Sequence, residues 1–214
     1  MAEAIPPEAI PPEAIPPEAT PKEKLLATVV GVALAGGIAD KSLRSIAAAA
    51  GTSHRMLIHH FGSREGLLVE VIKAVETRQR VALTELVAAG GAGGEVTTEL
   101  ADRFWKHLRS PDLAPQERLF FEVYGQALQG RQWATPLLDG IVEDWVGPVA
   151  AMLETYGISP QTARTVARLW VAVGRGLLLD VLATGDDAEV DMAMQFFSEM
   201  LLAHVGPRQA GRDG

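Results

Sequence analysis

Two short helical patterns on either side of a glycine turn constrain the fold of this chain more than any other feature. They cover residues 43–50 and 54–61, and a serine that can cap the helix precedes each of them. Gly51 in the turn can adopt a positive φ, and Ala47 is small enough for the two helices to cross closely. Apolar side chains can lock the pair together, at Ile46, Ala50, Leu57 and Phe61. The stretch therefore predicts a helix-turn-helix, whose second helix presents a polar, partly basic face suited to the major groove of DNA.

The remaining residues show helical periodicity only. Thr20 and Glu23 form the capping box of a first helix, which a glycine pair ends at residues 36–37. Ser63 caps a long helix that reaches about residue 88. Five further helical patterns follow, over residues 96–108, 116–128, 136–156, 160–183 and 189–205. Because no alternating strand pattern with hairpin turns interrupts them, the sequence predicts an all-α protein.

The N-terminal residues repeat the pentapeptide EAIPP three times over residues 3–17, and a degenerate EATP follows at residues 18–21. Paired prolines fix φ, remove amide donors and disfavour helix at the preceding residue. We therefore expect residues 1–20 to form an extended, disordered tail, with a partner-binding proline ligand as the alternative. The glycine-rich residues 90–94 predict a flexible break.

Composition and charge exclude several classes of protein. No apolar run reaches the ~18 residues of a membrane span, and the N-terminus lacks the pattern of a signal peptide. The absence of cysteine excludes disulfides, thiol catalysis and cysteine-based zinc sites, and it fits a cytoplasmic location. The net charge of −8 argues against binding to nucleic acid, but the distribution of charge along the chain does not. Residues 22–80 carry nine Lys/Arg against five Asp/Glu, a net +4, whereas residues 81–214 carry ten against eighteen, a net −8.

Three pieces of this basic segment resemble the TetR-type, tetracycline-repressor-like, family of bacterial transcriptional regulators. They are SLRSIA at residues 42–47, AGTS at residues 50–53 and HHFGSREGLL at residues 59–68. The resemblance covers residues 22–70 and extends to the remainder only as a helical layout. It implies about nine helices in a two-fold dimer: three in an N-terminal helix-turn-helix DNA-binding domain, and about six for effector binding and dimerisation.

The resemblance also implies where the domains begin and end. After the Pro-rich tail of residues 1–20, a DNA-binding domain covers residues 21–66. A helical effector-binding and dimerisation domain covers residues 67–206, and a flexible tail covers residues 207–214.

The DNA contacts that the resemblance implies lie around the turn. Backbone phosphates are assigned to Ser42, Arg44 and Arg64, and groove contacts to His54, Arg55, Met56 and His59. Ser53 caps the second helix, and the backbone amides next to it can also bind a phosphate. His60 is the last of the residues that the second helix directs outward. Arg55 stands where the family usually has glycine, and it can pair bidentately with guanine. Ile58 stands where the family usually has a phosphate-contacting tyrosine, so that contact is not carried over.

Three of the five histidines lie in the second helix of this motif: His54, His59 and His60. Two metal ligands on one helix face are usually spaced by three or four residues, and spacings of five, six and one do not converge. We therefore predict neither a metal site nor a cofactor, and the histidines are read as DNA contacts or surface residues.

The predicted effector domain is rich in large aromatic residues. Most of them must be core, but the resemblance implies that a subset lines an apolar cavity between helices. The candidates are Trp105, Phe121, Tyr124, Trp145 and Trp170, with Glu122, Gln126 and Arg175 as polar groups that could orient a ligand.

The last two helical patterns, residues 160–183 and 189–205, suggest an interface between protomers. The first of them carries two apolar stripes, one along Val166, Trp170, Val173, Leu177 and Val181, the other along Leu169, Ala172, Gly176 and Leu179. A helix with two apolar stripes must pack on its own core and on something else. We expect a four-helix bundle formed by two protomers.

Together with these patterns, the resemblance to TetR-type regulators implies a homodimeric repressor that binds a palindromic operator and is released by a small apolar or aromatic effector. One alternative is a dimeric DNA-binding regulator without an effector. Another is a helical enzyme acting on a hydrophobic substrate, but no nucleophile–base pair, phosphate loop or two-histidine metal helix supports it.

Overall fold

The computed structural model describes residues 19–89 and 98–205, and every element in these ranges is a helix. The predicted all-α fold is thereby confirmed. Residues 1–18 of the predicted tail at residues 1–20, the predicted tail at residues 207–214 and the break at residues 90–94 lie outside the described residues. The helices in chain order are α1 (Pro21–Gly36), α2 (Leu43–Ala49), α3 (His54–Phe61), α4 (Arg64–Ala89), α5 (Thr98–Leu108), α6 (Ala114–Leu128), the 3-10 helix η1 (Thr135–Leu137), α7 (Glu143–Thr155), α8 (Pro160–Thr184) and α9 (Asp187–Val205).

Side-chain caps start the N-terminal helices where the sequence predicts them. The Thr20 hydroxyl accepts from the Glu23 amide at 3.3 Å, and the Glu23 carboxylate accepts from the Thr20 amide at 2.7 Å. Ser42 and Ser53 cap α2 and α3 by accepting from the amide three residues later, each at 3.2 Å. These bonds satisfy amides that a helix start would otherwise leave without a partner.

One predicted helix, over residues 136–156, is wrong as a single element. The structure has the short helix η1, an irregular stretch, and then α7. Gly140 lies in the irregular stretch with φ of +77°, which a right-handed helix does not allow. A glycine with positive φ therefore separates η1 from α7.

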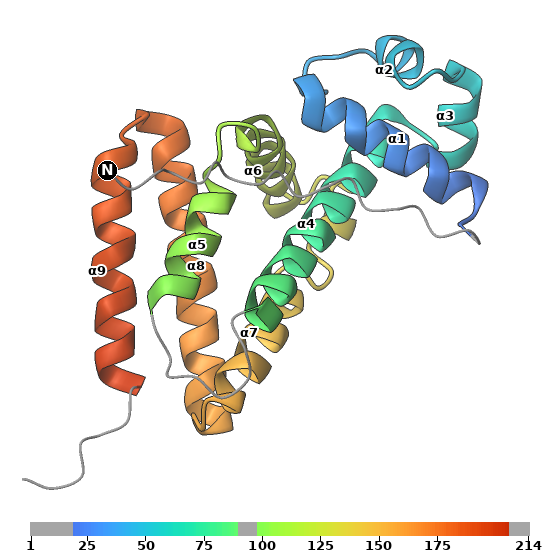
Figure 1. Cartoon of the computed structure of the whole chain (residues 1–214). Helices are drawn as coiled ribbons and strands as arrows, with labels where there is room; N and C mark the ends of the chain where they lie inside the picture. Colours follow the sequence, from blue (N-terminus) through green and yellow to red (C-terminus); the bar gives the residue numbers. More distant parts are fainter. Residues whose placement is uncertain (1–18, 90–97, 206–214) are drawn as a thin grey trace, which may run out of the picture.

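Two apolar cores organise the helices (Figure 1). The first joins α1, α2 and α3 to the beginning of α4, and it includes α6 and η1. The second joins the end of α4 to α5, α7, α8 and α9. Phe121 of α6 and Val142 before α7 pack against both cores. The 26 residues of α4 run from the N-terminal helices into the second core, so this helix links the two.

No helix within residues 19–89 and 98–205 is long and apolar enough to cross a membrane.

Candidate nucleic-acid interface and internal cavity

The turn between α2 and α3 has the geometry that the sequence predicts. Gly51 has φ of +63°, and the Thr52 amide donates to the Ala47 carbonyl at 2.9 Å. Ile46 and Leu57 are completely buried, and Ala47 is 3% exposed. Because both helices are fixed from the inner side, the outer side of α3 is held as a rigid face.

That outer face of α3 is exposed at Ser53, His54, Arg55, Met56 and His59. Two apolar side chains belong to it, because Met56 is 42% and Ile58 39% exposed. Arg44 of α2 is also exposed, and no ion pair in the described part of the chain involves Arg44 or Arg55. Both guanidinium groups are therefore available to an external anion.

Three other residues predicted to contact DNA have roles inside the protein. Ser42 caps α2. His60 is half-buried, with its ring edge-on to the Phe61 ring at 6.2 Å. The Arg64 guanidinium donates to the Lys41 carbonyl at 2.9 Å and to the Ala39 carbonyl. Arg64 thus ties the loop before α2 to the start of α4, a role that the sequence did not indicate. DNA contact by these residues stays a prediction.

The second core contains a cavity of about 240 Å³ that is partly open to solvent. The end of α4 forms one wall, and α5, α7, α8 and α9 form the others. The lining is mainly apolar: Leu83, Leu86, Val87, Thr98, Glu99, Leu100, Ala101, Arg103, Phe104, Val149, Met152, Leu153, Tyr156, Val166, Trp170, Ser198, Leu201, Leu202 and Val205. Trp170 and Phe104 stack at 5.6 Å between ring centroids. The cavity suits a small molecule with a flat apolar surface.

Of the five aromatic residues predicted to bind a ligand, only Trp170 lines this cavity. Trp105 follows the cavity residue Phe104, but its indole points elsewhere and donates to the Asp191 carboxylate at 2.8 Å. Phe121 packs between the two cores. The other two, Tyr124 and Trp145, belong to a polar cluster described next. None of the predicted polar groups Glu122, Gln126 and Arg175 lines the cavity either.

A buried polar cluster joins α4, α6, α7 and α8 between the two cores. The Trp145 indole donates to the Glu76 carboxylate at 2.7 Å, and Arg175 lies 3.5 Å from the same oxygen. Arg175 also donates to the Ile141 carbonyl at 2.6 Å and lies 5.9 Å from the centre of the Tyr124 ring. The Arg175 side chain therefore supplies the positive charge of this cluster and helps to hold its helices together.

The second half of the cluster connects α6 to α4 and to α1. The Gln79 amide donates to the Glu117 carboxylate at 2.8 Å, and the Gln116 amide donates to the Ala33 carbonyl at 3.0 Å. Burial raises the pKa of Glu117 to about 7, although the hydrogen bond from Gln79 and the charge of Arg175 oppose the rise. Burial also raises the pKa of Glu76. Two buried acids thus lie between the helix-turn-helix and the cavity.

The sequence does contain a signal for this cluster. The apolar stripe of α4 has buried residues at Leu68, Ile72, Val75 and Ala82, and the position one turn after Val75 is Gln79. Gln79 is only 5% exposed. A polar residue on an apolar stripe needs a buried partner, and here Glu117 supplies it.

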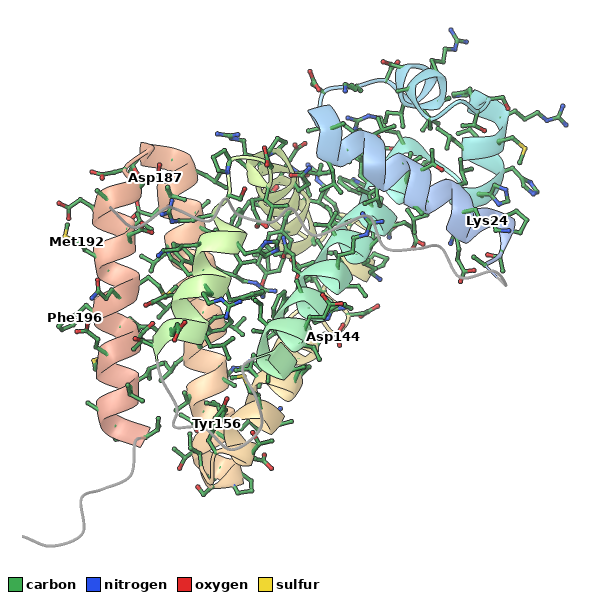
Figure 2. All side chains as sticks on the ribbon, in the orientation of Figure 1. Lys24, Asp144, Tyr156, Asp187, Met192 and Phe196 are labelled. Carbon is green, nitrogen blue, oxygen red and sulfur yellow. The ribbon has the colours of Figure 1, made fainter. Side chains whose placement is uncertain are left out.

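The outward sides of α8 and α9 carry exposed apolar residues. Leu169 and Leu179 of α8 are 47% and 51% exposed, and Met192, Phe196 and Met200 of α9 are 57%, 69% and 52% exposed. Met192 and Phe196 project from α9 away from the other helices (Figure 2). Single exposed apolar residues are ordinary, but a row along two neighbouring helices marks an interaction surface.

Comparison with known proteins identifies the N-terminal helices. Residues 25–71 match the profile of bacterial regulatory proteins of the tetR family. No curated protein sequence matches the chain.

Several solved structures are similar in fold. A transcriptional regulator from Rhodococcus sp. Rha1 has a TM-score of 0.66 at 20% identity, covering 86% of this chain and 97% of that one. A TetR transcriptional regulator from Legionella pneumophila has a TM-score of 0.58 at 19% identity, covering 85% and 97%. The multidrug binding protein EbrR, in complex with imidazole, has a TM-score of 0.58 at 24% identity, covering 92% and 100%.

Proposed function

Because residues 25–71 are a TetR-family N-terminal domain and the described chain has the fold of TetR-type transcriptional regulators, we propose that this protein is a repressor that binds operator DNA through α3. The observation that carries the proposal is the exposed outer face of α3, locked from behind by a buried helix-turn-helix core. Arg44 and Arg55 supply positive charge at this face. A duplex recognises such a face through its phosphates and its base edges.

The protein acts as a homodimer through α8 and α9. The exposed row from Leu169 to Leu179 on α8 and from Met192 to Met200 on α9 supports this assembly, because it would be shielded from water in a four-helix bundle of two protomers. The Cβ position of Gly176 on the same side has no neighbour within 4 Å in the protomer, which leaves room for a partner helix.

A small apolar or aromatic effector in the cavity releases the repressor. The continuity of α4 supports this mechanism, since its residues Leu83, Leu86 and Val87 line the cavity while its first turn follows α3 directly. A ligand that displaces the end of α4 changes the position of α3 relative to its copy in the dimer. Such a change alters the match of two recognition helices to successive grooves.

Selection of bound sequences from a random DNA library tests the proposal. A dimer places two copies of α3 one helical turn, ~34–36 Å, or a multiple apart, so the selected sites should be pseudo-palindromes with that half-site spacing. Selection of asymmetric single sites only, or of no sites at all, would refute the proposed dimeric DNA binding.

A further inference from the structure

Met56 is an apolar side chain on the outer face of α3, away from the core that locks the helix-turn-helix. That core takes Leu57, which is completely buried, and Phe61, which is 8% exposed, whereas Met56 is 42% exposed. The exposed residue His59 follows Met56 by three positions and Arg55 by four. Because helical residues at these spacings are neighbours on one face, the proposed DNA face combines a guanidinium and an imidazole with an apolar group.

The first turn of α3 fixes the backbone of Met56. It is the third residue of the helix, and its amide donates to the Ser53 hydroxyl at 3.2 Å in the helix cap. In a helix-turn-helix, the N-terminal residues of the second helix contact base edges in the major groove. The thioether side chain has three rotatable bonds, so its tip can adjust to a group on the floor of the groove.

A methionine side chain cannot make the contacts that phosphates and most base edges require. It carries no hydrogen-bond donor, and its sulfur is only a weak acceptor. Among the groups that base pairs present in the major groove, the C5-methyl of thymine is the apolar one. The exposed guanidinium groups of Arg44 and Arg55 attract a polyanion to this face, so duplex DNA is the partner that brings such a methyl group to Met56.

Ile58 is the other exposed apolar residue of α3, at 39%, but it cannot reach the same methyl group. Successive helical residues are about 100° apart, so Ile58 lies about 160° around the helix axis from Met56. The two apolar side chains therefore lie at opposite edges of the outer face. Substitution of Ile58 is for this reason a control for substitution of Met56.

We infer that Met56 determines operator specificity: each half-site contains a T·A base pair whose thymine C5-methyl group packs on this side chain. The inference rests on the proposed binding of operator DNA through α3, and it names a base that α3 reads there.

The experiment removes the methyl group from the DNA. In a duplex carrying the operator selected from the random library, each thymine of one half-site is replaced in turn by uracil, which lacks only the C5-methyl. Dissociation constants are measured by fluorescence anisotropy with the full chain at one fixed salt concentration. The wild type should lose affinity at one thymine position by about fourfold, the factor that corresponds to burial of one methyl group.

Variants of the protein connect this loss to Met56. Met56→Ala should bind the thymine operator more weakly than the wild type and should show no further loss with uracil at that position, as a double-mutant cycle requires. Met56→Leu and Ile58→Ala should both keep the loss. Val81→Ala is the matched control, because Val81 is 40% exposed but lies ~25 Å along α4 from its first residue, and it should behave as the wild type. Since Met56 is exposed, Met56→Ala should keep the helical circular dichroism and the melting temperature.

Two kinds of failure are distinguishable in this experiment. Operator binding that is insensitive to uracil at every position, selected half-sites without thymine, or a uracil loss that persists in Met56→Ala would overturn the inference and leave the proposed DNA binding intact. Failure to bind any duplex would refute the proposed function and this inference with it.

Discussion

Replacing Glu117 with glutamine is expected to stabilise the protein at pH 8 and to change its stability little at pH 4.5. Glu117 is 5% exposed, and burial raises its pKa from 4.5 to about 7. An acid with a raised pKa in the folded state contributes stability that is fully present below pH 4.5 and is lost as the pH rises to about 7. Glutamine is neutral at every pH, and its amide oxygen can still accept the hydrogen bond from Gln79.

The magnitude follows from the difference between the two pKa values. Each pKa unit corresponds to 1.36 kcal/mol, so a pKa of about 7 against 4.5 gives an upper limit of about 3 kcal/mol at pH 8. Glu76 is also buried with a raised pKa, and its charge contributes to the raised pKa of Glu117. The difference between wild type and Glu117→Gln therefore includes both the burial of Glu117 and the repulsion between these two carboxylates.

Urea denaturation between pH 4.5 and pH 8 measures this difference at a fixed protein concentration, as the proposed dimer requires. Glu122→Gln is the control, because Glu122 is exposed on the same helix and should give parallel curves for variant and wild type. A gain in stability by Glu117→Gln that is the same at pH 4.5 and pH 8 would show that burial does not control this carboxyl, and the reasoning would be wrong.

Two further predictions concern the DNA face and the dimer. If Arg55 pairs with guanine, Arg55→Ala should cost ~1–3 kcal/mol of operator affinity and relax the preference at one base pair per half-site. A loss of affinity that is uniform across sequences, with a flatter salt dependence, would indicate a phosphate contact instead. No loss of affinity would exclude both contacts. Gly176→Arg should give a monomer by light scattering that is still folded by circular dichroism, because one protomer has open space at this position and a partner helix packed there would clash with the arginine. Its operator affinity should fall by orders of magnitude. Gly147→Arg on α7, also without a neighbour within 4 Å, should remain dimeric, and a dimeric Gly176→Arg would place the interface elsewhere.

Local chemistry made the N-terminal helices predictable from the sequence. Hydroxyl caps at Thr20, Ser42 and Ser53 depend on residues at most three positions away, so their effect can be read without the fold. The same holds for the turn at Gly51. The division of residues 136–156 at Gly140 was missed, because apolar spacing continued across the glycine.

The cavity could not be predicted from aromatic content alone. Phe104 and Trp105 are neighbours in sequence, but successive helical residues point about 100° apart, and only Phe104 reaches the cavity. Trp105 is also buried, but its indole donates to Asp191 of α9, 86 residues away. Pairings at such distances follow from the tertiary fold and have no local signature.

The buried polar cluster connects the wall of the cavity to the helix-turn-helix. Along α4, Leu83 lines the cavity, Gln79 bonds to Glu117 of α6, and Leu68 belongs to the core of the helix-turn-helix. A hydrogen bond of 2.8 Å weakens steeply when its atoms separate, whereas apolar contacts tolerate small slides. Sliding of α4 against α6 therefore has to break the bond from Gln79 or carry α6 with it. Since the neighbouring Gln116 is bonded to the Ala33 carbonyl of α1, moving α6 also moves α1, which packs in the same core as the helix-turn-helix. The cluster thus ties α4 to α6, so a ligand that displaced α4 would move α6 with it, and Glu117→Gln, which keeps this bond, should alter stability without uncoupling the two helices.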